Sequence, residues 1–210
     1  MSDRYVHMRL DDFLAAIAAE QPAPGGGAVA AVTVAAGAGL AAMAARFSKG
    51  SFDESSDFVL DADHLRERAA RLADADAGAY DAVLKAYALP RTGDSTQRRE
   101  RIRAALRYAT EIPLQIADVG AKVAALAVRL LEAGNRNLRG DAYAAVCLAD
   151  AAVRSAAVLV QINTDIGELE RDLIDHAERE VEAAASAVCE AVIFMNGKHN
   201  QAAVVSEGGV

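Results

Sequence analysis

Alanine is the feature of this sequence that most restricts its fold. It supplies 50 of the 210 residues, whereas Phe, Trp and Tyr together make up 5%. Alanine has the highest helix propensity and is depleted in strands, and only four prolines interrupt the chain. We therefore predict an all-α protein and exclude an all-β or α/β fold.

Apolar residues at helical spacing divide the chain into about six mostly long helices. Proline, glycine and polar runs mark the breaks, and Pro113 predicts a kink or a helix break at Ile112. Neither a linker nor a repeat is evident, so we predict one helical bundle over residues 1–197 and a disordered tail over 198–210. Its long alanine-rich faces suggest a homodimer. The expected helices span residues 10–20, 28–47, 57–88, 95–131, 139–163 and 167–195.

Residues 28–45 contain one polar side chain, Thr33. The segment is almost long enough to cross a membrane, but it consists mostly of alanine and glycine and has few residues that drive insertion. We expect a helix buried on all sides rather than a membrane span. Gly37 and Gly39 would let a neighbouring helix approach it closely.

Charge and cysteine content exclude several partners and compartments. The net charge is −8 with few aromatic residues, which does not match a nucleic-acid-binding surface. The arginine-rich run at 98–103 is interpreted as a solvated helix face. Cys147 and Cys189 are isolated, as in proteins of a reducing cytosol, and residues 1–9 lack the apolar core of a signal peptide. We predict a cytoplasmic protein.

Common catalytic and metal-binding motifs are missing from the sequence. The four histidines are scattered, and Asp61 and His64, three residues apart on one helix face, could hold a metal only with further ligands. A surface pair explains them better, so neither a metal nor a cofactor is predicted. There is no Gly-x-Ser-x-Gly nucleophile motif and no P-loop.

The segment Pro24-Gly25-Gly26-Gly27 is the least expected part of the chain. Three consecutive glycines have a high conformational entropy in the unfolded state, and they directly precede the apolar helix. They fit a helix N-terminus whose bare amides receive an anionic or carbonyl group. A tight turn between close helices fits them equally well.

Pro22-x-Pro24-Gly25-Gly26-Gly27, followed by a helix of small residues, resembles the opening motif of the cyclodeaminase/cyclohydrolase family. That family includes the cyclodeaminase domain of formimidoyltransferase-cyclodeaminase and bacterial methenyltetrahydrofolate cyclohydrolase. Similar segments follow in order along the chain, from about residue 10 to residue 195. They are residues 79–83, 86–90, 109–114, 134–137, 141–142 and 154–157, and Asn163.

The resemblance implies an all-α bundle, usually dimeric, that acts on one-carbon units of tetrahydrofolate. The cyclodeaminase closes formimidoyltetrahydrofolate to methenyltetrahydrofolate and releases ammonia, whereas the cyclohydrolase adds water to the methenyl bridge and opens it to a formyl group. Both reactions pass through a tetrahedral carbon between two nitrogens. They need a proton shuttle and a negative group facing an amidinium-like cation.

Asp141 is the first candidate for that carboxylate, and Asp81 is the second. Asp141 follows the turn at Asn135 and Asn137, although it is equally suited to cap the next helix. Asp81 is one turn before Lys85, and an exposed ion pair between them is the favoured alternative.

The remaining candidates are substrate-binding residues at the matched positions. Asparagine side chains could hold substrate amides, and Arg154 an acidic or carbonyl group. The full set comprises Gly25, Gly26, Gly27, Ser48, Lys49, Asn135, Asn137, Tyr143, Arg154, Leu159 and Asn163.

Several motif positions depart from the family pattern. Family members carry a lysine cluster after the apolar helix, whereas this chain has Lys49 before Gly50 and then Asp53 and Glu54. Tyr143 and Leu159 replace a small residue and an asparagine. These changes make the site more apolar and leave two alternatives open. One is a cyclase or lyase acting on a non-folate imine in specialised metabolism, and the other is a non-catalytic helical binding protein.

Overall fold

The computed structural model describes residues 5–50, 55–91 and 95–207, apart from the side chains of residue 55 and residues 198–207. The described residues form six α-helices and no strand, which confirms the all-α prediction. Short 3₁₀ helices at Tyr5–His7 and Arg136–Leu138 precede α1 and α5. The α-helices are α1 (Leu10–Ala18), α2 (Gly26–Arg46), α3 (Ser55–Tyr87), α4 (Ser95–Ala133), α5 (Arg139–Gly167) and α6 (Asp172–Glu207).

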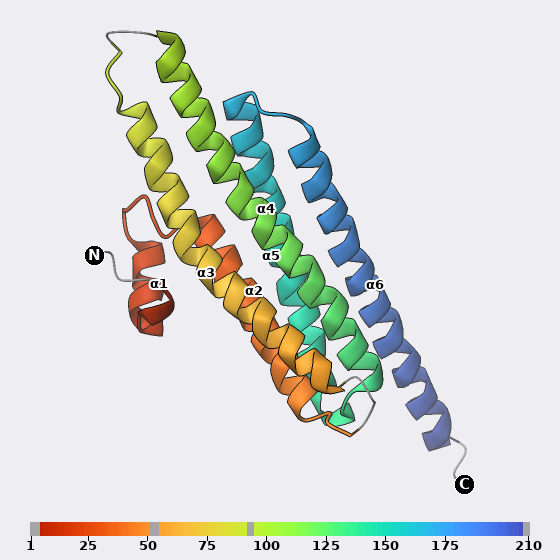
Figure 1. The fold of residues 1–210 in the computed structure, drawn as a ribbon. Coiled ribbons are helices and arrows are strands. Elements are labelled where there is room, and N and C mark those ends of the chain that lie inside the picture. The colour runs from red at the N-terminus through yellow and green to blue at the C-terminus, as the bar shows by residue number, and fades with distance from the viewer. Residues whose placement is uncertain (1–4, 51–54, 92–94, 208–210) are drawn as a thin grey trace.

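Five long helices lie side by side, and the short α1 lies against one flank (Figure 1). Helix α2 packs against α3, α4 and α5, while α6 packs against α4 and α5. The connections are short, so consecutive long helices run in opposite directions. The start of α2 and the end of α5 are therefore at one end of the bundle. The end of α2 and the start of α5 are at the other.

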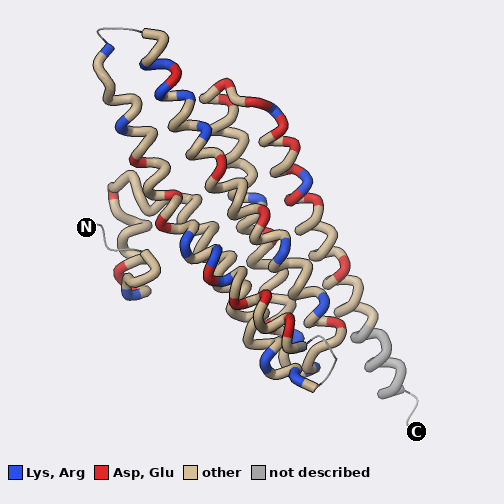
Figure 2. The backbone as a smooth tube through the Cα atoms, viewed as in Figure 1, with Lys and Arg blue, Asp and Glu red and all other residues tan. Residues whose placement is uncertain are grey.

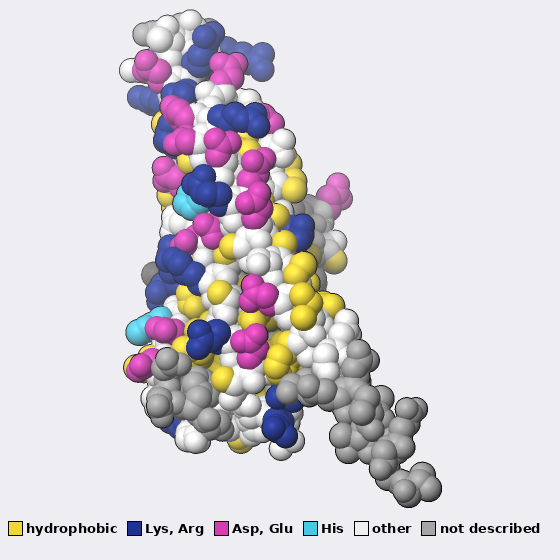
Figure 3. All heavy atoms as spheres, turned by 90° about the vertical axis from the view of Figure 1, so that its right-hand side faces the viewer, with side chains coloured by type: hydrophobic (Ala, Val, Ile, Leu, Met, Phe, Trp, Pro, Cys, Tyr) yellow, Lys and Arg dark blue, Asp and Glu magenta, His cyan; other side chains and the backbone are white. Residues whose placement is uncertain are grey.

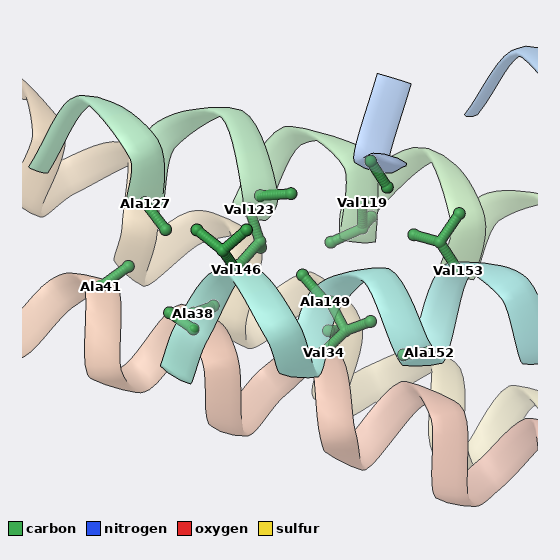
Figure 4. Packing of buried hydrophobic residues seen from close by; sticks show 14 of the residues in the cluster. Val34, Ala38, Ala41, Val119, Val123, Ala127, Val146, Ala149, Ala152 and Val153 are labelled. Atoms are coloured by element: carbon green, nitrogen blue, oxygen red, sulfur yellow. The ribbon is translucent and has the colours of Figure 1, made fainter. Parts of the chain in front are cut away.

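Small side chains fill the centre of the bundle. Figure 4 shows Ala38 and Ala41 of α2 facing Val123 of α4 and Val146 of α5, and all four are almost completely buried. A Cβ atom on Gly37 would lie 3.2 Å from the carbonyl oxygen of Ala145, so α2 and α5 approach closely there, as predicted. At Gly39 the nearest atom would be 3.8 Å away, on the Arg66 side chain, so this glycine is not required for close packing.

One predicted helix boundary is wrong, and one of the two alternatives at Pro113 is excluded. Helix α4 continues through Pro113, so the helix does not break at Ile112. Gly167 does not begin the last helix but ends α5, where Glu168 adopts a left-handed conformation with φ 46°. A glycine at the end of a helical pattern often ends the helix. The prediction instead placed Gly167 at the start of the next helix.

Helix α2 packs against α3, α4 and α5 but is not buried all round, because Ala36 is exposed. By length and composition, α2 and the segment 136–167 are each apolar enough to cross a membrane. In their most apolar 18-residue stretches, 56% and 39% of the residues are buried in the bundle. Core helices of soluble proteins have the same property. The two helices pack against each other. Their exposed apolar residues therefore lie on neighbouring parts of the surface.

Charged residues of both signs are spread along the helices, with Lys and Arg interspersed with Asp and Glu (Figure 2). On the face around α6, hydrophobic side chains are visible between charges of both signs (Figure 3). The predicted tail at 198–210 lies largely outside the described side chains, and so do Asp53 and Glu54. Their predicted properties stay predictions.

Candidate active site

A cavity of about 450 Å³ opens where the start of α2 meets α3, α4 and α5. This volume lies in the range of small-molecule sites, about 300–1,000 Å³. Most of the lining is apolar, and two half-exposed tyrosines, Tyr80 and Tyr87, lie at its edge. Apolar lining residues include Ala79, Val83, Leu84, Leu106, Leu159 and Ile162.

Asp76 of α3 supplies the charged side chain among the residues that line this cavity. Burial raises the pKa of Asp76 above its ordinary value, and a hydrogen bond donated by the backbone N–H of Ala28 opposes this shift without cancelling it. A carboxyl group whose pKa is raised by burial keeps its proton to a higher pH than an ordinary carboxyl group does. Asp76 therefore has the properties of a general acid–base group.

The glycine run places the N-terminus of α2 beside that carboxylate. Gly25 is the N-cap, and its missing side chain provides no capping hydrogen bond. A Cβ atom on Gly27 would overlap the Asp76 carboxylate, so only glycine leaves room for Asp76 in this position. The first N–H groups of a helix have no acceptor within it, and those of Gly26 and Gly27 are next to the cavity.

Asn163 joins α5 to α4 at the wall of the cavity. Pro113 has no backbone N–H, so the carbonyl of Ala109 loses its usual partner one turn later. The side-chain Nδ2 of Asn163 donates to that carbonyl at 2.8 Å. This long-range bond explains why α4 tolerates Pro113, and it assigns Asn163 a structural role.

Replacing Asn163 with Leu is expected to destabilise the protein by about 1–3 kcal/mol, because the Ala109 carbonyl then has no donor. The penalty should shrink in a Pro113→Ala background, where residue 113 regains its N–H. Urea unfolding of the four members of this double-mutant cycle measures the effect. Equal penalties in both backgrounds would contradict this role for Asn163.

The cavity brings together five of the predicted substrate-binding residues: Gly25, Gly26, Gly27, Leu159 and Asn163. Asp81 is not among its lining residues. Its carboxylate is 59% exposed and lies 2.5 Å from the Nζ atom of Lys85, which is the surface ion pair favoured from the sequence. Arg154 also lies outside the lining, and its Nε donates to both carboxylate oxygens of Asp150 at 3.0 Å.

Ser48 and Asn135 are at the opposite end of α2. The Ser48 hydroxyl donates to the Ala44 carbonyl at 2.7 Å and accepts from the Asn135 backbone N–H at 2.8 Å. The Asn135 side chain donates to the Phe47 carbonyl and accepts from the Asn137 backbone N–H. These bonds build the turn between α4 and α5, so both side chains have structural partners.

Lys49, Asn137, Asp141 and Tyr143 belong to the same end as Ser48. Asp141 is in the first turn of α5, but the N-cap is Leu138, so the capping alternative for Asp141 is wrong. The neighbouring Cys147 thiol and burial both raise the pKa of Tyr143. Because α2 has 21 residues, the two ends are about 30 Å apart. One copy of the chain therefore does not bring Asp141 to the cavity.

One cluster on the side of the bundle has the composition of a metal site. The potential ligand atoms of Asp118, His176 and Glu180 lie within 4.8 Å of one another. Asp118 also pairs with Lys122 at 3.0 Å and with Arg68 at 3.4 Å. These cations already balance its charge, so the cluster is explained by ion pairing.

Comparison with known proteins agrees with this architecture. The model of the formiminotransferase-cyclodeaminase family matches residues 9–183. The methenyltetrahydrofolate cyclohydrolase of Methylorubrum extorquens is 36% identical over 162 residues, which cover 73% of this chain and 78% of that protein. The chain belongs to the cyclodeaminase/cyclohydrolase family. This family acts in folate one-carbon metabolism.

Two further relatives place the chain within this cyclodeaminase/cyclohydrolase family. The formimidoyltransferase-cyclodeaminase of Sus scrofa is 31% identical over 166 residues, which cover 75% of this chain but 31% of that longer protein. The formiminotetrahydrofolate cyclodeaminase structure from Thermotoga maritima superposes with a TM-score of 0.81 at 27% identity. The superposition covers 91% of this chain and 97% of that one.

The sequence-based prediction missed Asp76. The spacing of apolar residues along α3 nevertheless indicates its position. Asp76 lies four residues after Leu72 and seven after Ala69, both of which are buried. It therefore falls on the buried stripe of α3, where a carboxylate is unexpected.

Proposed function

We propose that this protein catalyses addition and elimination at the amidinium carbon of a tetrahydrofolate one-carbon derivative. The opening of the methenyl bridge by water is the first reaction to test, and the closing of a formimidoyl group with loss of ammonia is the second. The observation that carries the proposal is Asp76, a carboxyl group of raised pKa beside the N-terminal amides of α2 in an apolar cavity.

Asp76 supplies both functions that the chemistry needs. As a carboxylate it stabilises the positive amidinium group, which is otherwise disfavoured in an apolar site. As a base it takes a proton from the attacking water, and as an acid it returns a proton to the nitrogen that leaves the tetrahedral carbon. Burial shifts its pKa upward, toward the working pH at which proton transfer is most effective.

The N–H groups of Gly26 and Gly27 supply the complementary interaction. Addition of water gives the tetrahedral carbon a hydroxyl group, and elimination turns that group into a formyl oxygen. Amides at a helix N-terminus stabilise negative charge developing on such an oxygen. Because the Asp76 carboxylate lies against Gly27, the glycine N–H groups and Asp76 then face one reacting carbon from the same side.

Purified protein tests the proposal directly. We expect it to consume methenyltetrahydrofolate, followed by the loss of the methenyl absorbance, or to release ammonia from formimidoyltetrahydrofolate. Binding of either compound is measured separately by thermal shift, since a ligand at 100 times its Kd stabilises the folded state by about 2.7 kcal/mol. Absence of both turnover and binding would reject a folate substrate.

The apolar lining favours a second candidate, an enzyme that acts on a non-folate imine. Leu159 lines the cavity at a position where the family pattern has an asparagine, so one polar contact to substrate is lost. This candidate predicts that a hydrophobic cyclic iminium compound raises the melting temperature while both folates leave it unchanged. Asp76 would keep the same role.

A further inference from the structure

A second cavity, of about 280 Å³, lies where α3 ends and α4 begins, and it is called here the arginine cavity. Its lining contains three arginines and no carboxylate, and Figure 2 shows Lys and Arg residues on both helices at this end of the bundle. The neighbouring Arg103 and Arg107 both pair with Glu170. The three arginines of the cavity, in contrast, have no carboxylate partner among the described residues. The cavity is lined by Pro90, Arg91, Ser95, Arg98, Arg99 and Ile102.

One of these arginines, Arg98, is held in place by the end of α3. Its Nε donates to the Leu89 carbonyl at 3.2 Å, and its Nη2 donates to the Tyr87 carbonyl at 2.9 Å. Tyr87 is the last residue of α3, so its carbonyl has no donor within the helix. Arg91 and Arg99 are exposed and have no side-chain hydrogen bond among the described residues. Their guanidinium groups can therefore bind a ligand.

The arginine cavity adjoins the larger cavity that contains Asp76. Tyr87, whose carbonyl accepts from Arg98, lines the larger cavity. On α4, Ile102 lines the arginine cavity, and Leu106 lines the larger one. These two residues are one helical turn apart, about 6 Å along the axis, and residues at this spacing are neighbours on one face of a helix. The two cavities therefore follow each other along the same side of α3 and α4.

The order of groups along α3 matches the chemical order of a tetrahydrofolate. Such a substrate carries its one-carbon unit at one end and glutamate carboxylates at the other, with an aromatic ring between them. Asp76 lies within the larger cavity, the half-exposed Tyr80 and Tyr87 follow at its edge, and the arginines lie beyond. Asp76 and Tyr87 are about 16 Å apart along α3, so a ligand that reaches both must extend along the helix.

The charge of the two cavities points to the same assignment. Among the described residues that line the larger cavity there is no Lys or Arg, so this cavity alone offers no cation to an anionic group of the substrate. A guanidinium group donates two parallel hydrogen bonds to one carboxylate, which makes arginine well suited to bind carboxylates. The arginine cavity supplies the cations that the larger cavity lacks.

We propose that the arginine cavity binds the carboxylates of the substrate's glutamate tail through Arg91 and Arg99, while Arg98 holds the end of α3 next to them. The assignment rests on the proposed function, because the tail belongs to a tetrahydrofolate. It gives a ligand to part of the arginine-rich run at 98–103. Arg101 is exposed and lies outside the lining, as expected for the solvated part of that run.

The double variant Arg91→Gln/Arg99→Gln tests the tail site in the steady state. The tail is bound equally in the substrate complex and in the transition state, so its loss should raise KM for methenyltetrahydrofolate at least about tenfold and change kcat less than about twofold. KM of the variant should also respond less to sodium chloride, which screens charge attraction. Arg101→Gln is the matched control on α4 and should keep the wild-type KM. A wild-type KM in the double variant, or a loss confined to kcat, would overturn the proposal.

A shortened substrate shows which part of the molecule the arginines contact. Methenyltetrahydropteroate ends in a carboxylate on the aromatic ring and lacks the glutamate. The wild-type protein should have at least about a tenfold higher KM for this compound than for methenyltetrahydrofolate, whereas Arg91→Gln/Arg99→Gln should treat the two alike. The same KM ratio in both proteins would show that the arginines do not contact the tail, and would reject the site.

The tail site is also measured without turnover. Tri-γ-glutamate, which is the tail alone, should raise the melting temperature of the wild-type protein and of Arg101→Gln, but not that of Arg91→Gln/Arg99→Gln. Inorganic phosphate at the same ionic strength is the comparison. If phosphate stabilises the wild-type protein as much as tri-γ-glutamate does, or if the double variant responds like the wild-type protein, the assignment to the tail is wrong.

These outcomes separate the two proposals. Arginine-dependent binding of tri-γ-glutamate by a protein that does not turn over folates keeps the carboxylate site and rejects the proposed reaction. Folate turnover with a KM that does not depend on Arg91 and Arg99 keeps the reaction and rejects the tail site.

Discussion

Replacing Asp76 with Asn is expected to lower kcat by about 10²–10⁴-fold, the usual contribution of a general acid–base group. The amide keeps the size of the carboxyl group and still accepts a hydrogen bond from the Ala28 N–H, but it neither exchanges a proton nor balances an amidinium charge. Steady-state kinetics with methenyltetrahydrofolate measures the loss. Asp81→Asn is the matched control, because Asp81 is a surface carboxylate five residues further along the same helix. It should retain full activity.

The same variant should be at least as stable as the wild-type protein at neutral pH. Burial raises the pKa of Asp76 above 3.8, so the folded protein binds this proton more tightly than the unfolded chain does. The group's contribution to the free energy of unfolding therefore decreases as the pH rises from 3.8 through the folded pKa. Asparagine lacks this titration.

Urea unfolding at several pH values checks the sign of this effect. The difference in stability between Asp76→Asn and the wild-type protein should favour the variant most at pH 7–8 and become smaller in acid. Lost activity with retained stability would assign Asp76 to the chemistry. A variant that is fully active, or that is destabilised equally at every pH, would contradict the role proposed for Asp76.

Gly27→Ala is expected to lower activity by about 10²-fold, the scale on which small displacements of a reacting group act. The added Cβ overlaps the Asp76 carboxylate, so the carboxyl group must move away from the Ala28 N–H and from the substrate. Stability should change little, because alanine has the higher helix propensity and the displaced side chain is near a cavity. Enzyme kinetics and thermal unfolding, measured on the same samples, separate the two effects.

Gly78→Ala is the control for this experiment. Gly78 is exposed in α3, two residues after Asp76, and a Cβ atom there would have no neighbour within 4 Å. The substitution should raise the stability by about 0.5–1 kcal/mol and leave kcat unchanged. Wild-type activity of Gly27→Ala would show that the position of Asp76 is not critical.

Sequence reasoning predicted the helices well because their signals are local. Alanine content and apolar spacing located five long helices, and the resemblance to the family agreed with that architecture. The sequence left open whether the helix breaks at Pro113, because the interaction that compensates for the missing N–H is not local. The donor that satisfies Ala109 is Asn163, 54 residues away on another helix, and no pattern around Pro113 indicates it.

Only part of the site was predicted, again because the deciding contacts are not local in the sequence. The glycine run, Leu159 and Asn163 do line the cavity, whereas the carboxylate was chosen near the matched motifs rather than from the burial pattern of α3. Ser48 and Asn135 were grouped with the glycines, yet they lie at the other end of α2 and bond to each other. Motifs give an order along the chain, but they do not give distances between helix ends.

The alanine-filled contact between α2 and its neighbours limits how this chain can vary. Residues such as Ala28, Ala31 and Ala38 are completely buried, and only glycine has a smaller side chain. Almost every substitution there adds volume and forces helices apart, with a penalty of about 1–3 kcal/mol. Substitutions that enlarge these core side chains are therefore disfavoured. The larger residues that line the cavity can be replaced by either smaller or larger ones. The substrate range can diverge on a backbone whose helix spacing is held constant.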